Sequence, residues 1–339
     1  MNIQNSLTKM KPYSIKPFLL LVILISAGVV SGPGTAAAGE LGHYMPGVAS
    51  IRDFYVPPVP GFYYEQYNLY YTTDTFNDRD GNSVDSINIG PVIINLDTEF
   101  DLIAIQPTFI WSTDWHIFGA RYAAYFGVPV ASASIQAALS TTTNHGIQID
   151  DSNWGLGDIY LRPIWLGWNT PHFGTSLSYG LYAPTGKYDA DAADNIGLGF
   201  WTHEFEAAVT WFPWEHQGTA VMVTGTYEIH HDKEDVDITP GDRFSLDWGV
   251  SQYLPINEDG SVLAELGLTG YSQWQVENDS GSDVINALNV KDEVHSIGIQ
   301  LGVASVPHNA SLVFRFLKEF EAKARFEGEL YVLTFAKGF

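Results

Sequence analysis

The chain has 339 residues, of which 45% are hydrophobic and 14% aromatic, so it carries too much apolar surface for intrinsic disorder. Its 39 acidic residues outnumber 16 basic ones, which gives a formal net charge of −23 and argues against a nucleic-acid partner. The chain contains no cysteine, which excludes a disulfide framework.

The first 38 residues are typical of an export signal. Lys9, Lys11 and Lys16 precede an apolar run over residues 18–30, and residues 36–38 offer a small-residue cleavage site. The run is shorter than the roughly 20 residues that a spanning helix needs. We therefore predict a signal peptide over residues 1–38, with an uncleaved anchor as the alternative. Without it the chain has 13 basic and 39 acidic residues, because the removed part holds three lysines and no acid.

Residues 39–60 are expected to form a periplasmic segment, and an alternating pattern begins after them. The clearest example covers residues 94–104, where apolar residues alternate with Asn95, Asp97, Glu99 and Asp101. Such alternation predicts a strand with one apolar and one polar face. A soluble β-sandwich would show it as well, but the pattern recurs in most of the later strands. Lipid is therefore the expected solvent of the apolar face.

About 12 strands can be placed between turn residues, an even number that suits a closed bacterial barrel. They are expected at 61–73, 90–112, 116–139, 154–168, 172–184, 199–213, 217–230, 243–255, 261–276, 293–305, 309–319 and 325–339. Short turns, such as the one expected at residues 112–115, belong to the periplasmic rim and longer loops to the outside. The predicted fold is all-β, a closed antiparallel transmembrane β-barrel over residues 61–339.

Aromatic residues favour an outer-membrane setting. Many lie close to the expected short turns, where a girdle at the lipid interface would form. These are Trp111, Trp115, Trp165, Trp168, Trp211, Phe212 and Trp214. The last strand places Tyr331, Leu333 and Phe335 on one face and ends in Phe339. This ending resembles the assembly signal of outer-membrane barrels, so lipid and the barrel assembly machinery are the expected partners, with Phe339 as the signal residue.

Four passages resemble one family. They are residues 155–168, 182–189, 195–201 and 273–281, and the similarity extends over roughly residues 55–339. Together they resemble the "MetA-pathway of phenol degradation" family. The resemblance implies an outer-membrane barrel of a Gram-negative bacterium, encoded near catabolic genes for aromatic or poorly soluble compounds and related to transport. It implies fold and compartment more firmly than a solute.

Motifs for catalysis are scarce. His203 and Glu204 lack the second histidine of a zincin helix, and the surrounding alternation predicts a strand. His295 and Ser296 are adjacent in a strand, so they point to opposite faces and cannot act as base and nucleophile. Acidic loop clusters lack the spacing of a calcium-binding EF-hand, which favours solvated loops over Ca²⁺ sites. We expect no enzyme activity, no cofactor and no metal.

The polar faces of the strands predict the lumen, because a charge that faces lipid at mid-depth costs roughly 2–4 kcal/mol. The expected lumen and substrate path comprises Asp97, Glu99, Asp101, Arg121, Tyr125, Asp158, Tyr160, Arg162, Glu204, Glu206, Arg243, Asp247, Glu265 and Arg315. Acids and arginines could pair across a narrow barrel and fill it, or they could line an open pore. Both arrangements remain open at the level of sequence.

The sequence thus predicts an outer-membrane channel for passive uptake of small hydrophobic or aromatic compounds linked to catabolism. Two alternatives stand beside it: a general cation-leaning diffusion porin, and a nonconducting structural or sensory surface barrel. Flux of matched solutes would separate them, because the first channel prefers aromatic solutes, the porin does not discriminate and the surface barrel conducts nothing.

Overall fold

The computed structural model describes residues 41–339 apart from 90–91, 142–145, 191–194 and 285–288. The predicted signal peptide lies outside this part of the chain. None of the described residues belongs to a helix long and apolar enough to cross a membrane. The strands are β1 (Gly61–Phe76), β2 (Ser86–Ile89), β3 (Val92–Ile117), β4 (Ala120–Gly127), β5 (Val130–Thr141), β6 (Gly146–Leu156), β7 (Ile159–Asn169), β8 (Phe173–Ala183), β9 (Thr202–Trp211), β10 (Thr219–His230), β11 (Arg243–Pro255), β12 (Val262–Gln275), β13 (Glu293–Ser305), β14 (Ala310–Lys323) and β15 (Phe326–Gly338).

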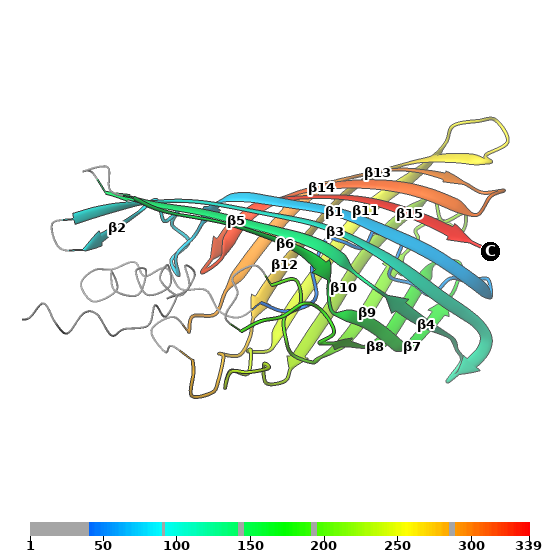
Figure 1. The fold of residues 1–339 in the computed structure, drawn as a ribbon. Coiled ribbons are helices and arrows are strands. Elements are labelled where there is room, and N and C mark those ends of the chain that lie inside the picture. Colours follow the sequence, from blue (N-terminus) through cyan, green and yellow to red (C-terminus); the bar gives the residue numbers. More distant parts are fainter. Residues whose placement is uncertain (1–40, 90–91, 142–145, 191–194, 285–288) are drawn as a thin grey trace, which may run out of the picture.

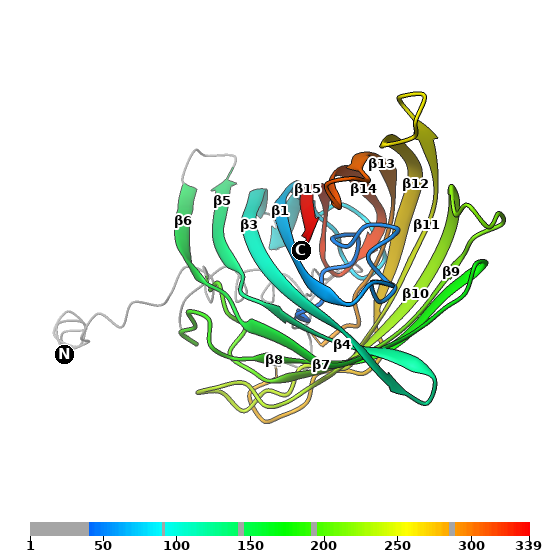
Figure 2. The ribbon, with the colours of Figure 1, turned by 90° about the vertical axis from the view of Figure 1, so that its right-hand side faces the viewer.

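Twelve of these strands close into an antiparallel barrel (Figures 1 and 2). Strands β7 to β15 follow one another as neighbours, and β15 pairs with β1. The ring is completed by the pairs β1–β3, β3–β4 and β4–β7. Closure leaves the ring without an unpaired backbone edge in the membrane. The predicted fold is confirmed.

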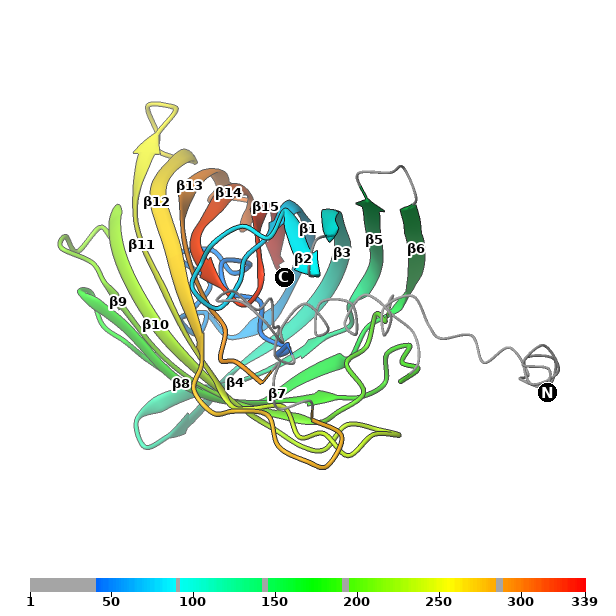
Figure 3. The same ribbon diagram turned by 90° about the vertical axis from the view of Figure 1, so that its left-hand side faces the viewer.

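Strand β3 is 26 residues long and has different neighbours along its length within one continuous sheet. Its second half pairs with β4 inside the barrel, whereas residues 94–105 pair with β5. Strand β6 pairs with β5, and β2 pairs with the start of β3. We call this extension, formed by β2, β5, β6 and the first half of β3, the mouth sheet. Figures 1 and 3 show it projecting beyond the ends of the other strands, on the side opposite the C-terminus.

Two predicted boundaries were wrong. Strand β3 continues through the turn expected at residues 112–115 by means of a bulge between Ser112 and His116, and turns only at Phe118 and Gly119. Both turn residues have positive φ angles, 52° and 79°. The single strand expected over 116–139 is divided into β4 and β5, because Pro129 has no backbone N–H to donate to a ladder.

The outward faces of the barrel strands form an apolar belt, as expected for a lipid-facing surface. The belt includes Ile103, Ile105, Phe109, Phe205, Val209, Leu266, Leu268, Ile297, Ile299, Leu301, Leu312, Phe314, Leu333 and Phe335. Trp111, Trp115, Trp211 and Trp214 are exposed near the short turns, where a girdle was predicted. Trp165 and Phe212 are buried instead, so their assignment to the girdle was wrong.

The outward face of β3 marks the extracellular edge of the belt. Ile103 and Ile105 are exposed on the same face as Glu99 and Asp97, which lie four and six residues before Ile103. Asp101 also shares this face and accepts a hydrogen bond from the exposed Tyr70 hydroxyl. The prediction that these three acids face the lumen was therefore wrong. Along this face the exposed residues change from isoleucine to acid near Asp101, while Leu96, Phe100 and Leu102 lie on the opposite face.

Candidate functional site in the barrel lumen

The lumen is occupied by the chain that precedes β1. We call residues 41–60 the N-terminal segment, which Figure 2 shows in blue inside the ring of strands. Its backbone N–H groups donate to side chains of the wall: Gly47 to Asp247, and Ile51 to Gln300. The expected periplasmic position of this segment was wrong. Ile51, Phe54 and Val56 are almost fully buried, which explains why the segment lies in the barrel rather than in water.

Carboxylates of the wall bind the outer half of the segment. Glu228 Oε1 accepts hydrogen bonds from the backbone N–H groups of His43 and Tyr44, at 2.8 and 2.7 Å. Asp247 accepts from the N–H of Gly47 at 2.7 Å and from the Tyr44 hydroxyl at 2.8 Å. These donors replace water around two buried negative charges, which would otherwise be costly to bury.

Gly47 is required where the segment passes the Tyr271 ring of the wall. Its φ angle is +80°, and a Cβ atom there would lie 2.8 Å from the Tyr271 ring. Any other residue would therefore be strained by its backbone conformation and would collide with the ring. Glycine therefore lets the backbone lie against Tyr271 while its N–H donates to Asp247.

Apolar packing and one arginine hold the inner half of the segment. Ile51 and Phe54 pack with the buried Phe212 and Met222, and Val56 packs with Trp165. The guanidinium of Arg52 donates to the backbone carbonyls of Gln217 and Gly218, in the short turn between β9 and β10. It also stacks over the Tyr253 ring at 3.9 Å. The segment is thus attached at the periplasmic end as well as at the outer end.

Five of the other predicted lumen residues lie together in a buried network around Arg162. Arg162 donates to Glu204 at 3.0 Å and to Glu206 at 2.9 Å, and the Tyr160 hydroxyl donates to Glu204. Tyr125 lies 5.5 Å from the Arg162 guanidinium. Arg162 and the two glutamates are thus paired with one another, in a lumen that also contains the N-terminal segment.

The remaining predicted arginines have separate partners. Arg243 forms a buried ion pair with Asp292, and Arg121 donates to the Thr113 carbonyl near the periplasmic end. Arg315 is fully buried and donates to Thr334 at 2.7 Å. Its Nε and Nη1 atoms have no hydrogen-bond partner among the described residues. The predicted residues Asp158, Asp247 and Glu265 contact the N-terminal segment rather than another wall charge.

Another part of the lumen carries a hydrophobic cluster, beside the buried Arg315 and Glu319 of β14. Residues from β1, β12, β13, β14 and β15 form one buried cluster there: Tyr67, Leu69, Tyr71, Tyr271, Val294, Leu317, Ala322, Leu330 and Val332. Phe100, Leu102 and Ala104 of β3 pack against it, as do Met45 and Val48 of the segment. The alternation on β3 could have revealed these residues, but only if the apolar face had been assigned to the inside.

This hydrophobic cluster ends in an aromatic group at the extracellular mouth. The rings of Phe100 and Phe326 are stacked with centroids 5.8 Å apart, and Phe76 meets Phe326 edge-on at 5.1 Å. Tyr71 lies beside Phe100 at 6.2 Å, and its hydroxyl donates to Glu319. We call Tyr71, Phe76, Phe100 and Phe326 the mouth aromatics.

Outside the barrel, two extracellular loops are joined by an acidic residue. Asp237, between β10 and β11, accepts hydrogen bonds from the backbone N–H and the hydroxyl of Ser282, between β12 and β13. These hydrogen bonds lower the pKa of Asp237 below its usual value. The acid therefore has a structural role in this loop pair.

Comparison with known proteins agrees with the geometry. A family model described as "Putative MetA-pathway of phenol degradation" matches residues 73–335. The chain belongs to this family. The search of curated proteins found no match.

Solved structures show a related fold. The COG4313 outer membrane channel from Pseudomonas putida F1 superposes with a TM-score of 0.61 and 14% identity, covering 88% of this chain and 100% of that chain. The β domain of the Bordetella autotransporter BrkA gives a TM-score of 0.40 at 8% identity, covering 83% and 100%, which is too distant to support an argument. The fold is that of an outer-membrane channel of Gram-negative bacteria, which confirms the predicted location.

Proposed function

We propose that this barrel passively admits small hydrophobic or aromatic compounds across the outer membrane. The observation that supports the proposal is the position of the mouth aromatics on the inner face of the extracellular opening. Flat apolar solutes gain free energy from leaving water and from ring contacts on such a surface. A general diffusion pore has no need for an apolar entrance.

The mouth sheet supports the same proposal. Strand β3 directs Leu96, Phe100 and Leu102 inward and Asp97 and Glu99 outward. This strand is therefore polar on its outer face and apolar on its inner face. This is the reverse of the transmembrane wall, where apolar residues face out. An apolar solute would therefore leave water on the inner side of the sheet.

The hydrophobic cluster of the lumen offers a path onward from the mouth. It continues from Phe100 along Leu102 and Ala104 to Met45 and Val48 of the N-terminal segment. A solute that reaches Met45 meets the segment itself. Onward passage requires the segment to move, so the hydrogen bonds that hold it set the rate of uptake.

Paired solutes test the proposal in proteoliposomes that contain the mature barrel. Phenyl glucoside and methyl glucoside share a sugar that keeps both out of lipid, and only the first carries an aromatic ring. We expect faster swelling with phenyl glucoside, and a severalfold loss of that preference in Phe100→Ser and Phe326→Ser. Glu99→Gln is the matched control, because Glu99 precedes Phe100 but faces outward.

The alternatives give different results in this assay. Equal swelling rates with the two glucosides would indicate a general diffusion porin and contradict the proposal. Absence of flux together with absence of phenyl glucoside binding would indicate a structural or sensory barrel. If both Phe→Ser variants admit phenyl glucoside as fast as the wild type, the surface that selects aromatic solutes lies elsewhere than at the mouth aromatics.

A further inference from the structure

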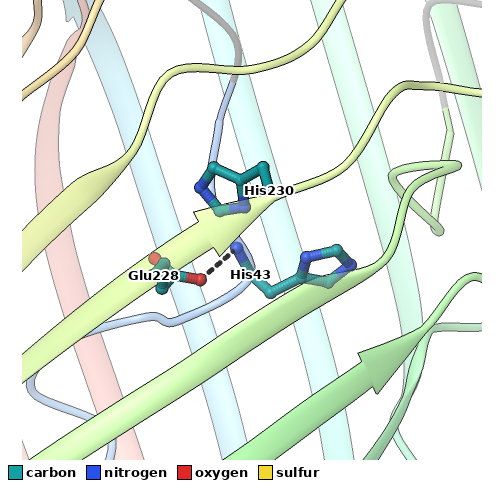
Figure 4. Close-up of side chains that lie close together, drawn as sticks. All are labelled: His43, Glu228 and His230. Carbon is teal, nitrogen blue, oxygen red and sulfur yellow. Dashed lines mark hydrogen bonds between the residues drawn. The ribbon is translucent and has the colours of Figure 1, made fainter.

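Three potential metal ligands meet where the N-terminal segment contacts β10. They are His43 of the segment and Glu228 and His230 of β10, drawn in Figure 4. One ligand atom from each lies within 4.8 Å of the other two. In a tetrahedral site with metal–ligand bonds of about 2.0 Å, ligand atoms are roughly 3.3 Å apart. Small side-chain rotations would therefore bring these three atoms onto one ion.

Two of the ligands carry buried atoms that lack a partner. Glu228 and His230 are 1% and 5% exposed, and among the described residues neither Glu228 Oε2 nor His230 Nε2 has a hydrogen-bond partner. An unsatisfied buried polar atom costs free energy, about 1–3 kcal/mol when neutral and more when charged. A cation placed between these atoms would satisfy both.

The hydrogen bonds assign the protons of the two rings when both are neutral. His43 Nε2 lies 3.0 Å from the Asp158 carboxylate, which can only accept, so this nitrogen carries the proton. The Thr202 hydroxyl lies between His43 Nδ1 and His230 Nδ1, at 2.7 and 2.8 Å. It donates to the first and accepts from the second. His230 Nε2 then carries no proton, and its lone pair is available to bind a metal ion.

The surroundings resemble the supporting shell of a metal site. A histidine ligand commonly donates its other ring N–H to a carboxylate, which fixes the ring and raises its basicity. Asp158 has this relation to His43, and it is itself fixed by the backbone N–H groups of Gly186 and Leu198. The nearby cation Arg243 is paired with Asp292, which reduces its competition for Glu228.

We propose that His43, Glu228 and His230 bind one Zn²⁺ ion, with a fourth position open to water. His43 binds through Nδ1, which exchanges its hydrogen bond from the Thr202 hydroxyl for the ion. Two imidazole nitrogens and one carboxylate oxygen form a ligand set that suits Zn²⁺. One ligand comes from the segment and two come from the wall. The ion therefore fastens the segment at the extracellular mouth, so zinc stabilises the closed lumen.

Zinc binding to the tag-free mature barrel in detergent tests the site, measured by equilibrium dialysis and calorimetry. We expect one ion per chain and at least tenfold weaker binding in His230→Ala and Glu228→Ala. Asp158→Asn should weaken binding by about 10- to 100-fold, because it removes the support of His43. A change of gel mobility on heating shows whether each variant is folded. If a variant of the wall does not fold, His43→Ala is used in its place, because it changes only the segment.

A second histidine pair provides the matched control. His203 Nε2 and His231 Nε2 lie 2.9 Å apart on the exposed outer surface, close to the same end of the barrel. The double variant His203→Ala, His231→Ala should bind zinc as the wild type does. Loss of binding in this variant, or retention in His43→Ala and His230→Ala, would assign zinc to the outer pair and overturn the proposal. So would a wild-type barrel that binds no zinc.

Cleavage by trypsin reports the effect on the segment. Arg52 is the one Lys or Arg within residues 41–60, so cleavage after it measures release of the segment. Zinc should slow this cleavage severalfold in the wild type and leave its rate unchanged in His43→Ala. Equal protection of both proteins by zinc would contradict the proposed fastening.

Discussion

The Nε atom of Arg52 donates to Glu265 at 2.9 Å, and both side chains are buried, with 8% and 2% of their surface exposed. This ion pair joins the N-terminal segment to β12 across the lumen. Together with the two turn carbonyls it occupies all three nitrogens of the guanidinium. It is therefore the main polar attachment of the segment at the periplasmic end.

Replacing Arg52 by alanine should release this end of the segment. Removing one partner of a buried ion pair typically costs about 3–5 kcal/mol, because the other charge is left unpaired. We expect higher ion conductance in planar bilayers and less stable folding in urea. The double variant Arg52→Ala, Glu265→Ala should recover part of the stability, and its conductance should stay as high as that of Arg52→Ala. Wild-type conductance in both variants would show that the segment is held elsewhere.

Deleting residues 41–58 should leave a folded barrel with an open lumen. The apolar belt and the closed ladder of strands do not depend on the segment, whereas Glu228 and Asp247 would become exposed to water in the pore. Rings of acidic side chains favour cations. Bilayer recordings should therefore show larger, cation-preferring currents. A protein that no longer shifts in mobility on boiling would indicate that the segment is part of the folding core.

The extracellular edge of the membrane can be located by two lysine substitutions on one face of β3. Ile105→Lys places a charge in the lipid and should destabilise folding by up to about 2–4 kcal/mol. Glu99→Lys changes the charge three pleats further along, in water, and should leave stability nearly unchanged. Both are measured by urea titration in lipid vesicles. Equal effects would place Glu99 in the membrane as well.

Removal of Phe339 should lower the amount of folded barrel in the outer membrane, if this residue acts as the assembly signal. Its side chain is 80% exposed, so its loss should not affect packing. Phe118→Ala is a suitable control, because Phe118 is exposed in a turn at the same end. Fractionation should show more degraded periplasmic material for the deletion alone. Unchanged folded protein would mean that the terminal aromatic is incidental.

Much of the barrel wall could be predicted because lipid surrounds its outer face throughout the membrane. Glu204, Asp247 and Glu265 were assigned to the lumen from alternation alone, and each is buried there. The same reasoning failed for Asp97 and Glu99, because periodicity separates two faces without telling which faces lipid. The mouth sheet extends beyond the membrane, so its polar face is the outer one.

The N-terminal segment could not be located from its sequence. Residues 41–60 show neither the period of a strand nor that of a helix, and several of their contacts lie more than 100 residues away, as with Gly47 and Asp247. The proposed metal ligands share this difficulty, since His43 and His230 meet only after folding. A motif search depends on short spacing and therefore missed them.

The pairing of β1 with β15 has a consequence for the order of assembly. It joins Tyr63 to Gly338, so the ends of nearly the whole barrel domain must meet before the ring is complete. Closing so long a loop is entropically costly and gives non-local pairs that form late. The segment continues directly into β1, one of the two strands of this seam. Once the seam has closed, the segment can leave only through an end of the barrel, so any opening that admits a solute is a movement along the axis.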